Sequence, residues 1–464
     1  MFSPSLRADI EDQLREALAA AADRRGPTVV SLTLPFNCDD PAACVFASRR
    51  VGDPFFCWEQ PDRGLRLAAL GRTHEVSSRG PDRFRRAAAD CAHLSGDAVI
   101  RGEGGFTTGP VWTGGFAFND EAAEGAVWSS FEPASMVLPE LTLQSSAAGD
   151  WLTINLLAGP GADREGLVAG AVARVAGLTH TELPMIDPHP AVSASIESVR
   201  SPKEYEQSVA EAVGRIRAGQ LEKVVLAREV VVRSAQAHDP AGLFGALRIG
   251  FPSCFNFCVG TGDAAFIGAS PELLVRCAGR GVATVALAGS TRRSSDPAVD
   301  GHLAQQLLAS RKDRGEQDLV VRRIVKALSR ISVWVEAADE PEIIKVANIQ
   351  HLGTPVYAQL AQPLTAIELA GLLHPTPAVG GEPWKKARRV MSEVEGMDRG
   401  WYAGPVGWMD ASGDGEFCVA LRSALLRDRE AHLFAGVGVV AESDPAAELA
   451  ETEIKLGALL PLLS

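Results

Sequence analysis

The sequence has no uninterrupted apolar stretch that approaches the roughly 18 residues of a membrane span, which argues against a membrane protein. Charged side chains interrupt the segment from Met1 to Ala21, so an amphipathic helix is expected there and not a signal peptide. The eight cysteines include no CxxC pair and have no histidine partner at zinc spacing. Buried free thiols in a reducing cytosol, and hence a cytoplasmic protein, are therefore expected.

The chain also lacks basic runs with interleaved aromatic residues, and its net charge is -13. Both features argue against nucleic acid as a partner. An anionic small substrate stays compatible with this charge, because a metal ion and a few basic side chains make a site positive whatever the total is.

With 464 residues, 46% of them apolar, the chain has enough apolar side chains for an extended core. Strands joined by hairpins, with helices in blocks, favour an α+β fold over a doubly wound parallel sheet. We expect large, mostly antiparallel sheets flanked by helices. Residues 1–195 are predicted to form an N-terminal α+β portion packed into the same body, and residues 196–464 a catalytic region. The most linker-like segment is Leu183–Pro190.

Turn-forming residues separate the predicted strands of the N-terminal portion, which are Thr28–Pro35, Phe55–Glu59, Leu65–Leu70, Val111–Phe118, Met136–Leu143 and Trp151–Leu157. The strands predicted in the second region are Leu221–Val232, Ser253–Gly260, Ala264–Gly268, Leu273–Cys277, Ala283–Leu287, and an antiparallel meander of Gly404–Met409, Phe417–Leu426 and His432–Val440. Capping and apolar periodicity predict helices at Glu165–Leu178, from Ser201 to about Ala218, at Val299–Arg330, after Thr365, and from Asp444 onward.

Lys223 lies in an apolar, β-branched stretch and shares a strand face with Val225 and Ala227. Burial disfavours the ammonium form, so a lysine here tends to lose its proton near neutral pH and can act as a base. The alternative is a lysine at a strand end whose chain reaches out to water.

Two predicted helices carry carboxylates where apolar side chains are expected. Glu316 interrupts a core-facing row at i, i+4 spacing, and Glu448 and Glu451 share one face of the last helix with Lys455. A buried carboxylate needs a cation, or it takes up a proton. Carboxylates from two helices can jointly bind a hard divalent ion such as Mg2+ and leave positions open for substrate. The alternative is a pair of solvated helix faces with i, i+4 ion pairs.

Four further features point to an anion site with an acid beside it. Gly289–Arg292, expected as a loop, and Gly436–Gly438, within a strand, can bring backbone N–H groups close to an anion, although glycines in a strand also mark bulges. Arg422, expected in mid-strand, requires a carboxylate of the protein or of a ligand. Glu272 follows a strand in apolar surroundings, where a raised pKa suits an acid; the alternative is a turn or helix cap.

Several segments of the second region, in their order along the chain, closely resemble the chorismate-utilising enzymes. This family comprises the isochorismate, salicylate, anthranilate and aminodeoxychorismate synthases. The resemblance covers about residues 200–460. The matching segments are Leu221–Arg228, Phe266–Leu274, Leu287–Arg292, Leu307–Val320, Leu373–Pro383, Arg399–Trp408, Glu416–Ala424 and Gly436–Leu456. The resemblance implies one large α+β body and a dicarboxylate substrate, chorismate, whose ring carboxylate is clamped by Mg2+.

The resemblance also implies roles for individual residues. Lys223 resembles the base that activates water for attack at C2 of the ring, and Glu272 the acid that protonates the departing C4 hydroxyl. Glu316 and Glu451 are implied as the Mg2+ ligands, with Glu448 and Asp313 nearby. The implied substrate contacts are Gly289, Ser290, Ala378, Tyr402, Arg422, Gly436 and Lys455, of which Tyr402 and Arg422 would hold the enolpyruvyl carboxylate.

The nucleophile separates the branches of the family. Anthranilate synthases have Gln at the position of Lys223, because ammonia, which usually comes from a glutaminase partner, needs no lysine base. Lys223 therefore favours water as the nucleophile. We expect a protein that acts without a glutaminase subunit, as a monomer.

The block His374–Pro383 resembles isochorismate synthases, which favours isochorismate as the product. Salicylate synthases are the main alternative, since they share Lys223 and Glu272 and then eliminate pyruvate. A glutaminase-dependent aminating subunit is a second, less favoured alternative. Tyr402 and Leu421 also occur in that branch. Gln317 stands where relatives commonly have His, and we expect it close to the metal. The product could serve menaquinone, siderophore or salicylate synthesis, which the sequence does not distinguish.

Overall fold

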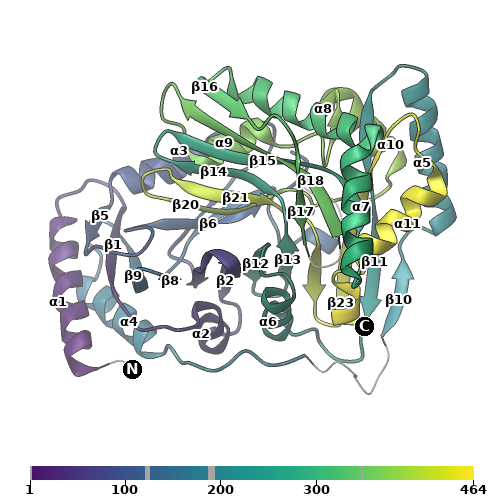
Figure 1. The fold of residues 1–464 in the computed structure, drawn as a ribbon. Helices are drawn as coiled ribbons and strands as arrows, with labels where there is room; N and C mark the ends of the chain where they lie inside the picture. The colour runs from purple at the N-terminus through teal and green to yellow at the C-terminus, as the bar shows by residue number, and fades with distance from the viewer. Residues whose placement is uncertain (1–2, 121–125, 187–193, 347–348) are drawn as a thin grey trace.

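The computed structural model describes the whole chain except residues 1–2, 121–125, 187–193 and 347–348. Two large sheets pack on each other through a shared apolar core, and helices cover their other faces (Figure 1). Every strand pair in the described residues is antiparallel except one, in which β1 (Thr28–Pro35) runs parallel to β5 (Val99–Arg101). The predicted α+β class with mostly antiparallel sheets is confirmed.

The first sheet has the spatial order β10 (Ser195–Ser198), β11 (Lys223–Arg233), β23 (Glu430–Val439), β22 (Ser423–Arg427), β13 (Ala265–Ser270), β12 (Phe255–Thr261), β2 (Pro54–Gln60), β3 (Leu65–Leu70), β8 (Leu141–Ser146), β9 (Gly149–Ala158), β1 and β5, with β19 (Gly381–Glu382) paired to β11. The second has the order β16 (Ser332–Ala337), β18 (Ile349–Leu360), β15 (Gly281–Arg292), β14 (Leu273–Ala278), β21 (Gly415–Val419), β20 (Pro405–Asp410), β6 (Val111–Phe116), β7 (Ala134–Leu138) and β4 (His74–Ser77), with β17 (Glu342–Lys345) paired to β18.

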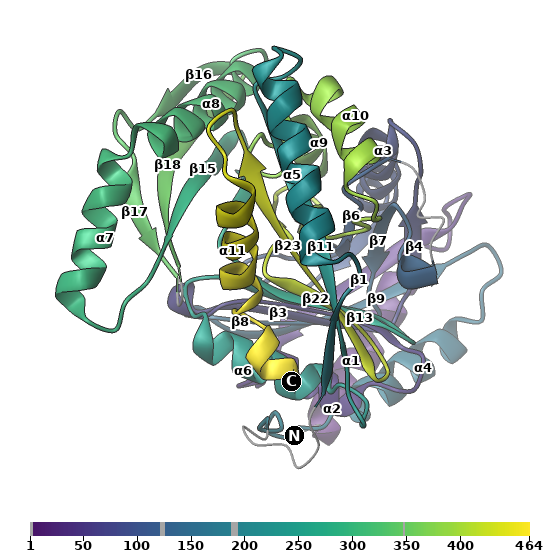
Figure 2. The same ribbon diagram turned by 90° about the vertical axis from the view of Figure 1, so that its right-hand side faces the viewer.

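The helices are α1 (Pro4–Ala20), α2 (Pro41–Ser48), α3 (Arg83–Gly96), α4 (Arg164–Ala176), α5 (Pro202–Arg217), α6 (Pro240–Gly250), α7 (Pro297–Ala309), α8 (Arg311–Leu328), α9 (Ala366–Leu373), α10 (Trp384–Val394), α11 (Pro445–Leu456) and α12 (Leu460–Leu463), with short 3-10 turns η1 (Pro61–Arg63) and η2 (Ala126–Trp128). Figure 2 shows α5 and α11 side by side over β11 and β23. None of the helices in the described ranges is long and apolar enough to cross a bilayer.

Strand β2 shows why the central strands are apolar on both faces. Phe56 and Trp58 enter the core between the sheets, while Phe55 and Cys57 enter a second core under α1, α2, α4 and α6. A strand covered on both sides has no polar face. Residues 1–195 and 196–464 contribute to the same two sheets, since β2 pairs with β12 and β6 with β20.

The helix starts predicted at Ser201, Thr365 and Asp444 are confirmed. The capping boxes at Ser201 and Thr365 both form, and the side chain of Asp444 caps α11. The prediction of a single helix over Val299–Arg330 is wrong, because the first helix ends before Ser310 and a second helix begins after it. The backbone of Ser310 is extended, and its side chain accepts a hydrogen bond from the N–H of Asp313, which starts α8 in a new direction.

Two predicted strands are each divided between the sheets. Met136–Leu143 becomes β7 and β8, and the chain changes sheets around Pro139. Phe417–Leu426 becomes β21 and β22, so the predicted meander is wrong. Arg422 lies between these strands with φ +48°, in the left-handed region, and not in mid-strand.

Gly289–Arg292, expected as a loop, belongs to β15, where a bulge lies between Ala288 and Ser290. Gly289 has φ +68°, and a Cβ there would lie 2.9 Å from Cβ of Asp313, so glycine permits the close approach of α8. Part of the expected linker, residues 187–190, lies outside the described residues.

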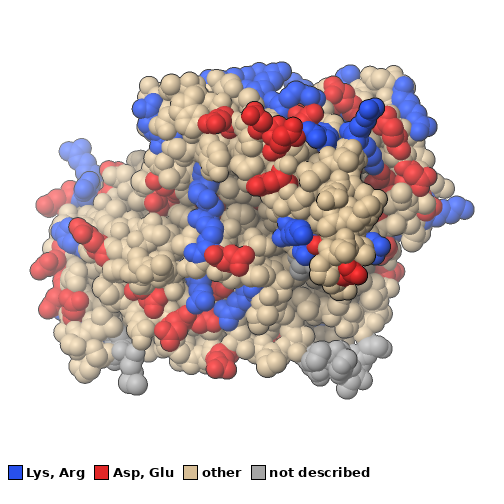
Figure 3. Space-filling view, viewed as in Figure 1, with Lys and Arg blue, Asp and Glu red and all other residues tan. Residues whose placement is uncertain are grey.

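Figure 3 shows both signs of charge on the face seen in Figure 1. Basic side chains form a short column down the middle of this face, and acidic side chains lie beside them. The global net charge of -13 therefore coexists with locally basic surface.

Candidate active site

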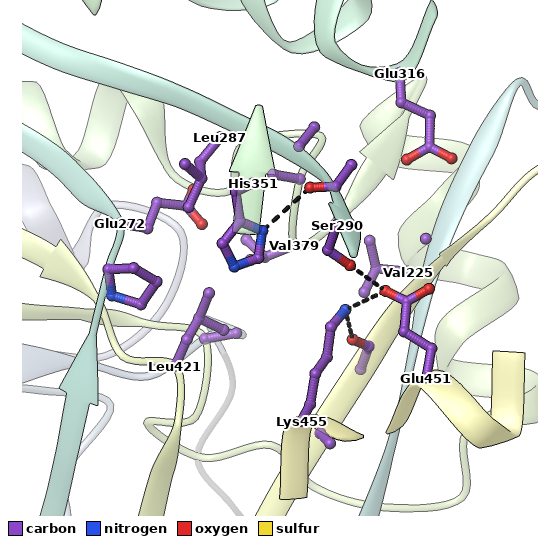
Figure 4. A pocket seen from close by; sticks show the side chains of 18 of the residues that line it. Val225, Glu272, Leu287, Ser290, Glu316, His351, Val379, Leu421, Glu451 and Lys455 are labelled. Carbon is purple, nitrogen blue, oxygen red and sulfur yellow. Dashed lines mark hydrogen bonds and ion pairs between the residues drawn. The ribbon is translucent and has the colours of Figure 1, made fainter. Parts of the chain in front are cut away.

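A pocket lies where β11, β23, β15, α8 and α11 meet (Figure 4). All eleven site residues expected from the sequence line it: Lys223, Glu272, Gly289, Ser290, Glu316, Ala378, Tyr402, Arg422, Gly436, Glu451 and Lys455. The fold thus gathers into one cavity residues that are more than 200 positions apart along the chain.

Lys223 is the first residue of β11 and is only 3% exposed, so the alternative of a side chain that reaches out to water is wrong. Its Nζ lies 3.1 Å from Oε2 of Glu316. The neighbouring strand makes room for this contact at Gly438, where a Cβ would lie 2.7 Å from Cε of Lys223. A glycine in β23 therefore admits the lysine to the pocket.

Glu272 lies between β13 and β14 and is 3% exposed. Burial raises its pKa to about 8, against the opposing effects of a hydrogen bond from Thr376 Oγ1, 3.4 Å from Oε1, and of the charges on Lys223 and Lys455. The direction agrees with the sequence-based expectation. A carboxyl with this pKa is protonated at neutral pH and can donate a proton.

Glu451 is held in the opposite charge state. Burial alone would raise its pKa, but the charge of Lys455, with hydrogen bonds from Lys455 and Ser290, lowers it to about 2. Lys455 Nζ lies 2.8 Å from Oε1 of Glu451, and Ser290 Oγ donates to the same oxygen at 2.9 Å. Lys455 also donates to the carbonyl of Gly436. Glu451 is therefore an anion throughout the physiological range.

Glu316 and Glu451 stand at one end of the pocket in Figure 4, and Glu272 stands at the other. The donor set at the first end consists of carboxylate oxygens from α8 and α11, the ligand type that Mg2+ prefers. In the described ranges no three carboxylates have oxygens all within 4.8 Å of one another. Two carboxylates still fit Mg2+, which usually keeps several waters and takes only one or two from the protein.

Asp313 lines the same end of the pocket, and burial raises the pKa of its carboxyl. Glu448 lies outside the pocket lining and is 3% exposed. Burial raises its pKa as well, although Lys312 Nζ lies 3.3 Å from its Oε1. Burial thus shifts the pKa values of both carboxyls upward.

Tyr402 and Arg422 line the pocket together. The ring of Tyr402 stacks on Phe434 at 5.2 Å, and burial raises its pKa to about 12, so its hydroxyl keeps its proton. The left-handed backbone of Arg422 holds the guanidinium in the pocket, where it is 7% exposed. A donor hydroxyl and a guanidinium are suited to a carboxylate of a ligand.

His351, on β18, lines the pocket and was not expected from the sequence. Burial and the charge of Arg422 lower its pKa to about 3, so the ring is neutral. Its Nδ1 lies 3.1 Å from the carbonyl oxygen of Gly289 and its Nε2 lies 3.0 Å from Nη2 of Arg422. In a neutral ring, Nδ1–H donates to Gly289 and Nε2 accepts from Arg422. His351 therefore positions both the bulge and the guanidinium.

Arg399 is a second pocket residue that sequence reasoning missed. It is 1% exposed and pairs with Glu395, and it donates to the backbone carbonyls of Val225 and Val379. These bonds tie β11 to the segment that carries Ala378. Arg399 begins a segment that resembles the family, Arg399–Trp408, and this resemblance could have identified it as a site residue.

Gln317 does not line the pocket, and its expected closeness to the metal stays a prediction. Its Nε2 donates to the carbonyl of Ala286 at 2.9 Å and to Thr354 Oγ1 at 2.8 Å. A helix turns about 100° per residue, so the neighbour of a pocket-facing Glu316 faces the sheet.

Comparisons with known proteins show which family the chain resembles. The family described as chorismate binding enzyme matches residues 15–464. The salicylate biosynthesis isochorismate synthase of Pseudomonas aeruginosa is 37% identical over 446 residues, which cover 96% of this chain and 92% of that protein. Isochorismate synthase MenF of Bacillus subtilis is 33% identical over 426 residues, 90% of this chain and 89% of that protein. The solved structure of MenF, the menaquinone-specific isochorismate synthase from Escherichia coli, matches with a TM-score of 0.79 at 26% identity, and covers 99% of this chain and 100% of that chain.

Proposed function

The chain belongs to the chorismate binding enzymes, and on that premise we propose that it is an isochorismate synthase, which interconverts chorismate and isochorismate with Mg2+. The observation that carries the proposal is the single pocket that holds both Lys223 and a protonated Glu272. Water adds at C2 of the ring and the C4 hydroxyl leaves, so the reaction needs one group that takes a proton and another that gives one.

Glu272 fills the role of the acid. It has its proton at neutral pH because burial disfavours the anion, and Thr376 holds its carboxyl in place. It gives this proton to the C4 oxygen as the carbon–oxygen bond breaks. A positioned acid of this kind is worth about 10²–10⁴ in rate.

Lys223 fills the role of the base. In the structure its Nζ lies 3.1 Å from Oε2 of Glu316, at the end of the pocket that would hold the cation. In this proposal it takes the proton from the water that attacks C2.

Glu316 and Glu451 are the groups that would hold Mg2+, and the bound ion would supply the positive charge for the ring carboxylate of chorismate. Tyr402 and Arg422 bind the enolpyruvyl carboxylate in this proposal. The positions of two carboxylates would then fix the ring between the base and the acid.

The test is to incubate purified protein with chorismate and Mg2+, without ammonia or any second protein, and to separate the products. Isochorismate without pyruvate is the expected result. Salicylate with an equivalent of pyruvate would make the protein a salicylate synthase instead. Turnover that requires ammonia and a glutaminase partner would refute water as the nucleophile.

A further inference from the structure

A second group of reactive side chains, Cys38, Cys44 and His180, lies away from the pocket. In the described part of the chain this is the one group of three or more His, Cys, Asp or Glu side chains whose potential ligand atoms all lie within 4.8 Å of one another. The two cysteines belong to the core under α1, α2, α4 and α6, on the other side of the first sheet from the core between the sheets. The function proposed above makes no use of these residues.

The fold holds the three residues together through the backbone around them. Cys38 precedes α2, and its N–H donates to Asp150 Oδ2 at 3.4 Å. Cys44 lies within α2, and His180 follows α4. The N–H of Thr179, next to His180, donates to Ser48 Oγ at 2.9 Å, and this oxygen lies 4.0 Å from Cys44 Sγ. The segment after α4 is thus docked on α2.

The two thiols are buried and the imidazole is exposed. A hydrogen bond from Cys38 lowers the pKa of Cys44, and the same bond raises the pKa of Cys38. The imidazole is the one of the three side chains that reaches solvent.

We propose that Cys38, Cys44 and His180 bind a Zn2+ ion, with a solvent molecule in the fourth position. Two thiolates and one imidazole are ligands that zinc prefers in tetrahedral sites. The site is chemically separate from the carboxylates of the pocket, because Mg2+ takes oxygen ligands. Binding releases the thiol protons and joins the segment after α4 to α2, so zinc stabilises the N-terminal portion. The spacing along the sequence gives no sign of this site, because His180 lies 136 residues beyond Cys44.

The test uses the full-length protein without a metal-binding tag, purified under reducing conditions, loaded with Zn2+ and freed of excess metal. We expect about one zinc per chain, and a thiolate-to-metal charge-transfer band when Co2+ replaces it. Cys44→Ser and His180→Ala should each lose the zinc, and the Co2+ band should weaken or vanish. The zinc-dependent rise in melting temperature should vanish with it.

Two matched variants serve as controls, since Cys91→Ser removes a buried thiol elsewhere and His302→Ala removes an exposed imidazole elsewhere. Both should keep the zinc. Because His180 is exposed, His180→Ala stays informative even if Cys44→Ser fails to fold. The proposal is overturned if the reduced protein takes up no zinc, if His180→Ala binds as much zinc as the unmodified protein, or if mass spectrometry finds Cys38 and Cys44 joined in a disulfide that excludes metal.

Discussion

Glu272 and Glu451 stand at two ends of one pocket in Figure 4, and their pKa values move in opposite directions. The pKa of Glu272 is raised to about 8, and that of Glu451 is lowered to about 2. Glu272 is 3% exposed and has only a hydrogen bond from Thr376, at 3.4 Å. The side chain of Glu451 is 34% exposed and has Lys455 at 2.8 Å.

The difference shows that the residue type does not decide the charge state. Burial acts on both carboxyls, but Glu451 has a lysine in contact that outweighs it, and Glu272 has none among the described residues. One pocket thus contains a carboxylate anion and a protonated carboxyl, which suit the proposed cation and the proposed proton transfer. The expectations that follow test this division, from the largest effect to the smallest.

Removal of metal should have the largest effect, because it abolishes the proposed task of the anionic end. Treatment with EDTA should stop turnover of chorismate, and added Mg2+ should restore it. Turnover is measured from the isochorismate formed. Full activity in chelated, metal-free buffer would show that Glu316 and Glu451 serve another purpose.

Lys223→Gln should lower kcat by about 10²–10⁴, because glutamine cannot take a proton from water. The melting temperature and chorismate binding are measured alongside, and chorismate binding should persist. An unchanged kcat would rule out Lys223 as the base.

Glu272→Gln should lower kcat by about 10²–10⁴ at neutral pH, because the amide cannot protonate the departing hydroxyl. In the unmodified protein, activity should fall as pH rises through about 8, where Glu272 loses its proton. The pH profile of kcat measures this. A profile without a loss of activity near this pH would contradict the assignment of the acid.

The same substitution should make the protein more stable. Between the ordinary pKa of 4.5 and the folded value of about 8, Glu272 is ionised in the unfolded chain and protonated in the fold, so stability falls as pH rises through this window. Glutamine removes this penalty. We expect the free energy of unfolding to rise by on the order of 2–4 kcal/mol near the upper end of this pH window and to stay unchanged below the window. Denaturant titration measures this.

Glu59 offers a matched control on β2, outside the pocket. It is 1% exposed, and burial raises its pKa to about 7 despite the nearby charge of Arg248. Glu59→Gln should also stabilise the protein in the neutral range, by less than Glu272→Gln, but should leave turnover unchanged. Loss of activity in this variant would mean that burial alone, without contact to substrate, explains the effect at Glu272.

Glu451→Gln should lower the stability of the protein, the opposite of Glu272→Gln, and this effect should be the smallest. The folded pKa of Glu451 lies below the ordinary 4.5, so its contribution is complete above that value and is lost as pH falls toward 2. In metal-free buffer the variant should melt at a lower temperature than the unmodified protein at neutral pH, and the difference should shrink below pH 4.5. A variant as stable as the unmodified protein at neutral pH would show that Lys455 and Ser290 do not stabilise the anion.

Local rules in the sequence predicted much of the fold. The capping box at Ser201 and the cap at Asp444 are recognisable because each involves residues within one helical turn. Strands β1 and β3 have the predicted bounds, since apolar runs between turn residues mark them. Helices α2, α3, α6 and α10 were not predicted, and neither were strands β4, β5, β10, β16, β17, β18 and β19.

The predictions were wrong where tertiary packing divided a segment whose local sequence pattern is continuous. The run around Arg422 has the composition of one strand, but its two halves pair in different sheets. The helical pattern across Ser310 continues in composition, but the chain turns there. His351 was missed for a related reason, because nothing near it in the sequence shows that β18 pairs with the bulged β15.

The sequence, through its resemblance to the family, determined eleven of the residues that line the pocket, and its apolar residues around Glu272 indicated an acid there. Only the tertiary structure decided which cation each carboxylate contacts, that Gln317 faces the sheet, that His351 holds Arg422, and that Cys38 and Cys44 meet His180. The physical reason is the distance along the chain over which each effect acts. Propensity, capping and periodicity act over a few neighbouring residues, whereas charge states and metal sites depend on atoms that come together only when distant segments pack.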